Sequence, residues 1–233
     1  MKIIEVVAEA QDLPALAEFY AGQLGLTTQS SEHELQISVG ATRLTFVQGG
    51  AHRYHFAFNI PHNQLEAAAA WLPVPMLQGK SFQFEVWQAE SIYFLDPAGN
   101  ILELIARRPL ANASQQPFGP ASLLCLSEVG VACENVRELA EQLQEPFFHD
   151  SGSELFVAAG DDDGLIVFVK TGRIWYPDTG VPAVPTPLLV RMEGGKTLRS
   201  RAGIAFYPAS GPAAIVNSGP LADDPPRPLE VLF

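Results

Sequence analysis

The chain has 233 residues, and its 14 lysines and arginines against 26 aspartates and glutamates give a formal net charge of −12. Hydrophobic residues form 47% and charged residues 17% of the sequence, which excludes a disordered chain and is typical of a globular protein. The acidic balance argues against nucleic acid or an anionic membrane as a partner, and no run of about 20 apolar residues predicts a membrane span.

The protein is expected to be cytoplasmic. Glu5 places a carboxylate where a signal peptide needs an apolar stretch. Cys125 and Cys133 lie in apolar surroundings and lack CxxC spacing. We therefore expect two buried thiols rather than a disulfide or a metal-binding pair.

Three segments of the chain repeat one order of predicted elements: a strand, a helix, and then two or three strands. In the first segment, residues 2–7 alternate as a strand does, and Asp12 and Pro14 are typical of a helix start. Apolar residues at helical spacing continue from there until Gly25 ends the helix. Two strands then follow, over residues 35–39 and 43–47.

The second segment begins with an alternating strand over residues 55–60. An alanine run favours a helix over residues 64–72. The sequence DPAGN at 96–100 has the composition of a tight turn. Further strands are predicted over residues 82–87, 91–95 and 101–106.

The third segment begins with a strand over residues 123–131. A helix over about 136–143 follows, and then strands over 155–158 and 165–170. Beyond Trp175 the pattern stops. A proline-rich stretch over 176–187 leads to two further predicted strands, at 188–192 and 202–207.

These patterns predict an α+β protein built of repeated βαβββ modules. A module of about 50 residues cannot close a core alone and must stack on another copy. We expect the first two copies, over residues 1–110, to pair into one curved sheet with a central cleft. A linker (111–121) then leads to a third module with extra strands (122–207), which would pair with the C-terminal strands or with a second chain.

The C-terminal end of the chain contributes little to the predicted fold. Residues 208–228 form a Pro/Gly/Ala-rich tail with few side chains to bury. Residues 229–233 (LEVLF) match the start of a viral 3C protease site, which is typical of an expression-vector remnant.

Three ionisable side chains occupy unexpected positions on the predicted strands. Strand alternation places Glu5, His55 and Glu103 each on a face with apolar or small neighbours. A carboxylate facing a core is costly unless it is paired or bound to a metal. A divalent cation would neutralise the two glutamates, and neutral imidazole is a common further ligand. The sequence therefore predicts a metal site formed by these three residues.

Repeat symmetry places Thr45 at the fourth ligand position, where it is a poor ligand. Such a site keeps open positions for water or substrate, as catalytic metal sites do. The structural alternative is that Lys2, Arg107 and Arg108 pair with the glutamates. In that case His55 would be a hydrogen-bonded core residue.

The third segment carries Glu128 at the position equivalent to His55. It has Val167 in place of Glu103, so it cannot supply a complete ligand set. We expect a structural role for this segment and keep Glu128 as a candidate for a second site.

Aromatic residues gather on the strands of the second segment. Most are expected in the core, because large aromatic side chains dominate packing. Trp87 and Tyr93 are the candidates for the walls of a ligand pocket. Asn59, on the same strand face as His55, is the third candidate substrate-binding residue.

Two stretches resemble a known superfamily: residues 55–61 (HFAFNIP) and residues 93–104 (YFLDPAGNILEL). They are similar to the vicinal oxygen chelate superfamily, whose members include glyoxalase I, bleomycin-resistance proteins, fosfomycin-resistance transferases and extradiol dioxygenases. The likeness extends over about residues 2–108. It implies paired βαβββ modules around a metal, with ligands on first and last strands at Glu5, His55 and Glu103. Thr45 stands where glyoxalases carry a glutamate, and Glu5 stands where the family usually has a first-strand histidine. Extradiol dioxygenases need two histidines and one carboxylate, and only one histidine falls in place here. A standard glyoxalase I or catechol-cleaving activity is therefore not expected.

The resulting hypothesis is a divalent-metal-dependent enzyme, glyoxalase-like or dioxygenase-like, whose ion acts as a Lewis acid on a small oxygen-chelating substrate. Zn, Mn, Fe, Ni and Co are all candidates for the ion, and the reaction could be that of a lyase, an isomerase or a dioxygenase. The alternative is a metal-free protein of the bleomycin-resistance type, which sequesters a ligand in an acidic, aromatic cleft. In both cases we expect a small-molecule ligand and a homodimer.

Overall fold

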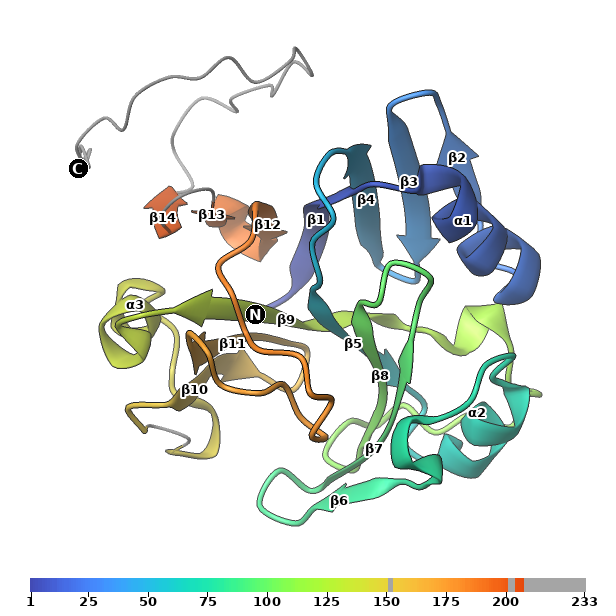
Figure 1. The fold of residues 1–233 in the computed structure, drawn as a ribbon. Coiled ribbons are helices and arrows are strands. Elements are labelled where there is room, and N and C mark those ends of the chain that lie inside the picture. The colour runs from blue at the N-terminus through green and yellow to red at the C-terminus, as the bar shows by residue number, and fades with distance from the viewer. Residues whose placement is uncertain (151–152, 201–203, 208–233) are drawn as a thin grey trace.

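Two sheets of seven strands each form the protein in a computed structural model, which describes residues 1–150, 153–200 and 204–207 (Figure 1). Sheet A contains β1 (Ile3–Ala10), β2 (Thr28–Ser30), β3 (Glu34–Val39), β4 (Thr42–Gln48), β12 (Leu188–Met192), β13 (Thr197–Ser200) and β14 (Ile204–Tyr207). Sheet B contains β5 (His55–Ile60), β6 (Phe82–Phe84), β7 (Ala89–Leu95), β8 (Ile101–Arg107), β9 (Cys125–Cys133), β10 (Phe156–Asp161) and β11 (Gly164–Lys170). The predicted tail and vector remnant, residues 208–233, lie outside the described residues.

Short helices follow the first strand of three modules. They are α1 (Leu13–Ala17) with its π-helical continuation η1 (Glu18–Gln23), α2 (Leu65–Trp71) and α3 (Val136–Gln142). The expected start of α1 is confirmed, because the Asp12 side chain accepts a hydrogen bond from the Ala15 N–H. Single 3₁₀ turns occur at η2 (Leu77–Gly79), η3 (Pro120–Ser122), η4 (Phe148–Asp150) and η5 (Glu193–Gly195).

The repeated βαβββ order confirms the predicted α+β fold class. The structure adds two short strands, β2 and β13, that the sequence pattern did not reveal. The strand predicted over residues 82–87 ends at Phe84, and Gln88 turns the chain with a φ of 46° before β7. Of the strand predicted over 202–207, residues 202–203 lie outside the described part. No helix in the described residues is long and apolar enough to cross a membrane.

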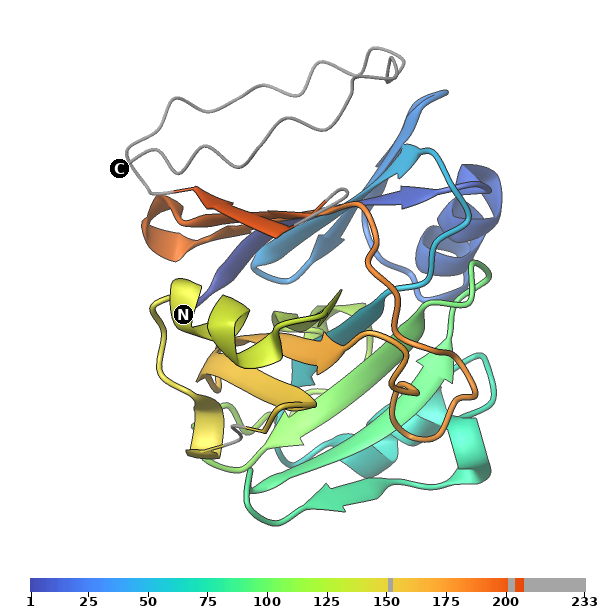
Figure 2. The same cartoon turned by 60° about the vertical axis from the view of Figure 1, so that its left-hand side comes forward.

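The modules pair differently from the expectation. Sheet B has the order β10-β11-β9-β5-β8-β7-β6, so the second module joins the third through antiparallel β5 and β9. Sheet A has the order β14-β13-β12-β1-β4-β3-β2, so the first module joins the C-terminal strands through β1 and β12. Figure 2 shows these C-terminal strands, in orange and red, continuing the blue sheet of the first module. The predicted pairing of the first two modules is therefore corrected: each has a different partner.

Strand alternation places the core and the site on opposite faces of sheet B. Phe56, Phe58 and Ile60 of β5 belong to a large buried cluster that includes side chains from both sheets and from α1, α2 and α3. Burying one such side chain stabilises the fold by roughly 1.5–3 kcal/mol. His55 and Asn59 point to the other face, which is also covered, so every residue of β5 is buried.

The turn between β7 and β8 ties the first module to sheet B. One oxygen of the buried Asp96 carboxylate accepts the backbone N–H groups of Ala98 (3.0 Å) and Asn100 (2.9 Å). The other accepts the Tyr20 hydroxyl at 3.0 Å and the Asn100 amide at 2.7 Å. Burial raises the pKa of Asp96 to about 6, although these hydrogen bonds oppose the rise. The DPAGN sequence therefore fixes a turn and also an interface between modules.

Candidate metal centre

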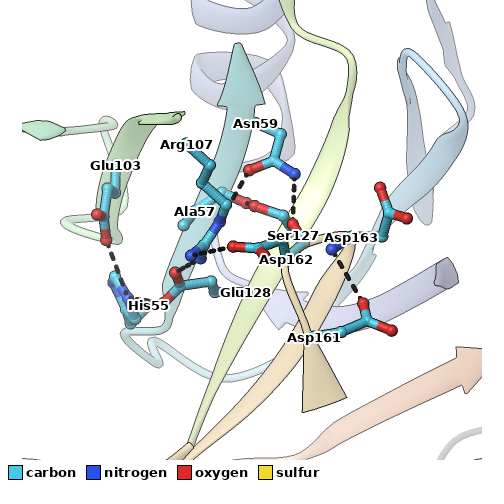
Figure 3. Close-up of polar contacts among 10 residues, drawn as sticks. All are labelled: His55, Ala57, Asn59, Glu103, Arg107, Ser127, Glu128, Asp161, Asp162 and Asp163. Atoms are coloured by element: carbon cyan, nitrogen blue, oxygen red, sulfur yellow. Dashed lines mark hydrogen bonds and ion pairs between the residues drawn. The ribbon is translucent and has the colours of Figure 1, made fainter. Parts of the chain in front are cut away.

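Three buried side chains meet on the inner face of sheet B (Figure 3). His55 begins β5, Glu103 lies within β8, and Glu128 lies within β9. One ligand atom from each lies within 4.8 Å of the other two. His55 Nε2 is 3.6 Å from Glu103 Oε2 and 4.0 Å from Glu128 Oε2. These groups are the side chains that divalent metals prefer in mixed nitrogen and oxygen sites.

The His55 ring is held in the protonation state of a ligand. Its Nδ1 lies 3.2 Å from the Ile101 carbonyl oxygen, which only accepts, so the neutral ring donates from Nδ1. Burial lowers the pKa of His55 to about 4, partly offset by this hydrogen bond, so the ring is neutral at neutral pH. The Nε2 lone pair then faces two carboxylates. A hydrogen bond from Nδ1–H to a backbone carbonyl, with Nε2 left free, is the usual outer-shell arrangement of a metal-bound histidine.

The two carboxylates are poorly compensated. Burial, and then the charge of Glu128, raise the pKa of Glu103, while the Ser91 and Tyr93 hydroxyls and Arg107 act in the opposite direction. Burial also raises the pKa of Glu128, against the charge of Arg107. Both shifts arise mainly from the burial of the two carboxylates, and a cation bound between them would act against both shifts.

Arg107 places a positive charge beside this cluster. Its side chain is fully buried at the end of β8 and forms an ion pair with Glu128. Its Nε donates to Asn59 Oδ1 at 3.2 Å, and its Nη1 lies 3.6 Å from Asp162 Oδ1. The guanidinium also lies against Phe148, 5.4 Å from the ring centre.

A cavity of about 250 Å³ opens over the three candidate ligands. Its walls are mainly aromatic and apolar: Phe84, Trp87, Tyr93, Phe156, Val167, Val169, Ile174, Trp175 and Tyr176. Arg173 also lines the cavity, with its guanidinium 5.1 Å from the Phe156 ring centre. The polar groups are therefore concentrated at the cluster, which is typical of a pocket that binds a small molecule.

Residues 171–187 form a strap between β11 and β12 that covers part of this cavity. Trp175 of the strap places its ring 5.5 Å from the His55 ring. Tyr176 packs on Tyr93 with ring centres 5.6 Å apart. Gly130 of β9 makes room for the strap, because a Cβ there would lie 2.5 Å from Trp175 Cη2.

Gly130→Ala is therefore expected to displace Trp175 from His55. We expect a red shift of tryptophan emission and a loss of about 1–3 kcal/mol in the free energy of unfolding, since overpacking forces neighbours to move. Emission spectra and urea titrations check both effects. Gly119→Ala is the control, because a Cβ at Gly119 meets no atom within 4 Å. Unchanged emission and stability in Gly130→Ala would contradict this account of the strap.

Two of the three predicted ligands, His55 and Glu103, come together as expected. Glu5 is placed elsewhere: it lies on sheet A and forms ion pairs with Arg43 and Arg191. The prediction of Glu5 as the third ligand followed from the wrong module pairing. Because the β1 edge pairs with β12, Arg191 stands opposite Glu5 and supplies the charge that a metal would have supplied.

Glu128 is the residue that completes the cluster. The sequence pattern had matched its position to that of His55, and the strand registers confirm this equivalence. Parallel pairing of the first and last strands aligns Val7 with Thr45, Ala57 with Glu103, and Gly130 with Val167. Glu5, His55 and Glu128 each lie two residues before the first-strand member of these pairs. The signal for Glu128 was therefore present, but the pairing of the second and third modules was needed to use it.

The three predicted substrate-binding residues have different surroundings. Trp87 and Tyr93 line the cavity above the cluster. Asn59 instead accepts a hydrogen bond from Arg107 and donates to the Asp162 carbonyl at 2.8 Å. It also lines a second cavity, of about 360 Å³. The predicted homodimer and cytoplasmic location stay predictions.

Comparison with known proteins finds likeness at the level of structure. No protein-family model and no curated protein matches the sequence. A putative dioxygenase from Bacillus subtilis subsp. subtilis str. 168 aligns over 72% of this chain and 63% of its own length, with 18% identity and a TM-score of 0.53.

Two shorter proteins also align with parts of the chain. Lactoylglutathione lyase from Agrobacterium tumefaciens is 21% identical over 44% of this chain and 90% of its own, with a TM-score of 0.37. A mutant of the fosfomycin resistance protein FosX from Listeria monocytogenes, complexed with Mn(II), is 18% identical over 45% of this chain and 87% of its own, with a TM-score of 0.38.

The alignment with the putative dioxygenase from Bacillus subtilis shows that the two chains share a fold. At such low identity the likeness shows the fold alone. The chemistry must therefore be argued from the site itself.

Proposed function

We propose that the protein is a divalent-metal-dependent enzyme that acts on a small substrate with oxygen donors. His55, Glu103 and Glu128 would hold the ion. The observation that carries this proposal is the convergence of three buried ligand atoms within 4.8 Å, from strands far apart in the sequence. When both are ionised, Glu103 and Glu128 carry two negative charges, which a divalent cation would neutralise. Arg107, the cation beside Glu128, also faces the carboxylate of Asp162.

The donor set fits a catalytic rather than a structural ion. One imidazole and two carboxylates leave coordination positions open, and Val167 occupies the fourth equivalent position without a donor atom. Zn, Mn, Fe, Ni and Co all accept such a set. When bound, the ion would supply Lewis-acid stabilisation of negative charge that develops on a substrate oxygen.

The chain itself would bind and orient the substrate. The aromatic walls suit a flat apolar body of about one ring, and the cavity floor presents the oxygen-binding cluster. Trp175 and Tyr176 of the strap line one side of the cavity, where they would shield a bound substrate from water and strengthen its electrostatic interactions. Burial also holds the pKa of the Tyr93 hydroxyl well above its ordinary value, so this hydroxyl stays protonated and can donate a hydrogen bond.

Metal analysis of the whole chain, purified without a metal-affinity tag, tests the proposal. We expect about one divalent ion per chain, and titration calorimetry of the chelator-treated protein should show one site for Mn²⁺, Zn²⁺ or Co²⁺. Because Trp175 lies 5.5 Å from His55, bound Co²⁺ should also quench tryptophan emission. Saturable binding that survives in both His55→Ala and Glu103→Gln would exclude this site.

A second candidate function rests on the same charge imbalance. A metal-free protein could use the acidic floor and aromatic walls to sequester a cationic aromatic compound, by charge attraction and by cation–π contacts with Trp87 and Trp175. Absence of stoichiometric metal, together with tight binding of a quaternary aromatic ammonium ion, would favour this function over the enzyme.

A further inference from the structure

Arg107 has an unusual position for an arginine. Its side chain has no exposed surface, and it contacts residues from three other strands and turns. Asn59 of β5, Glu128 of β9 and Asp162 of the β10–β11 turn surround its guanidinium. A buried guanidinium is tolerated only when it is paired. These contacts are therefore needed for folding, and Arg107 also places a positive charge beside the cluster.

The two carboxylate oxygens of Glu128 have different neighbours. Oε1 accepts a hydrogen bond from Arg107 Nη2, whereas Oε2 lies 4.0 Å from His55 Nε2, on the side of the other candidate ligands. Figure 3 shows Glu128 between Arg107 and His55, with Glu103 beyond the imidazole. Arg107 therefore leaves a single Glu128 oxygen available at the cluster.

The contact with Asp162 is electrostatic rather than a complete hydrogen bond. Arg107 Nη1 and Asp162 Oδ1 are 3.6 Å apart, and neither atom has a hydrogen-bond partner among the described residues. Asp162 is one-quarter exposed and is not a member of the three-residue cluster. Asp162 therefore acts on the cluster indirectly, by partly balancing the positive charge of Arg107.

We propose that Arg107 is an internal counter-ion of the metal centre, which holds one oxygen of Glu128 and so restricts this ligand to a single available oxygen. It compensates Glu128 when no ion is bound, and it presents one oxygen of Glu128 to an ion that enters. This inference rests on the proposed function, because it concerns the same three ligands. Arg107 keeps the cluster folded without metal and, by charge repulsion, it limits the affinity for a divalent cation.

Arg107→Met is the decisive variant, since it keeps the apolar length and removes the charge. We expect Mn²⁺ to bind about tenfold more tightly by titration calorimetry, because one positive charge near the ion is removed and both Glu128 oxygens become available. The urea midpoint of the metal-free variant should fall below that of the wild type, and saturating Mn²⁺ should restore most of the difference. Arg107→Lys keeps the charge and should bind Mn²⁺ with nearly wild-type affinity.

Unchanged or weaker Mn²⁺ binding by Arg107→Met would overturn the proposal. If that variant does not fold without metal, Asp162→Asn provides a milder test. It should weaken Mn²⁺ binding although Asp162 touches no ligand, because Arg107 is then less compensated and repels the ion more strongly. Equal affinities of Asp162→Asn and the wild type would also overturn it.

The outcomes for the two proposals can be told apart. If the wild type binds no divalent ion but Arg107→Met does, the proposed enzyme function fails and the counter-ion role stands. If neither protein binds an ion, both fail. If both bind with the same affinity, the metal centre stands and the counter-ion role fails.

Discussion

Glu128→Gln is expected to weaken divalent-metal binding more than roughly 100-fold, because it removes a charged ligand. Loss of a residue that only hydrogen-bonds to a ligand already costs roughly 10- to 100-fold in metal affinity. Glu5→Gln should leave the affinity unchanged. The two glutamates occupy equivalent positions on first strands, yet Glu128 lies in the cluster with His55 and Glu103 whereas Glu5 is bound by two arginines on sheet A. Titration calorimetry with Mn²⁺ on both variants measures the difference.

Glutamine is the appropriate substitution because its amide oxygen can still accept the hydrogen bond from Arg107. A truncation to alanine would leave a buried guanidinium with one carboxylate fewer, and the protein could lose stability for that reason alone. Urea titrations of both variants control for folding. Loss of metal from Glu5→Gln, with Glu128→Gln unaffected, would restore the ligand set expected from the sequence and would contradict the module pairing.

Gly40→Ala is expected to lower the free energy of unfolding by about 3 kcal/mol. Gly40 turns the chain between β3 and β4 with a φ of 51°, and an added Cβ would lie 1.9 Å from the Leu124 carbonyl oxygen. That oxygen belongs to the backbone leading into β9 and accepts a hydrogen bond from the Ala41 N–H at 2.9 Å. The substitution therefore pushes the β3–β4 turn of sheet A away from the segment that leads into β9 of sheet B.

Gly79→Ala is the matched control for this prediction. Gly79 also has a positive φ, of 63°, but a Cβ there meets no atom within 4 Å. It should cost only the backbone strain of the left-handed conformation, about 1 kcal/mol. Urea unfolding of both variants at one temperature gives the comparison. Equal losses would show that backbone strain accounts for the effect and that the contact with Leu124 contributes nothing.

Local structure and two of the three candidate ligands could be predicted from the amino-acid order alone. Alternation on β5 and β8 placed His55 and Glu103 on a covered face, because side chains of a strand point to opposite sides regardless of which strand lies alongside. The DPAGN turn was readable because Asp, Gly and Asn form such turns through contacts within a few residues. Even the equivalence of Glu128 with His55 followed from the spacing within each repeat.

The pairing of the modules, and therefore the glutamate that joins the cluster, became known only from the folded chain. The first strands of the modules present similar backbone edges, so hydrogen bonding alone does not distinguish β5–β9 from a pairing of β5 with β1. The observed pairing is accompanied by contacts between residues distant in sequence, such as Arg191 opposite Glu5 in sheet A and Trp175 against Gly130 in sheet B. Such contacts exist only once the whole chain has folded. A repeat pattern in the sequence shows where each module lies but not which other module it pairs with.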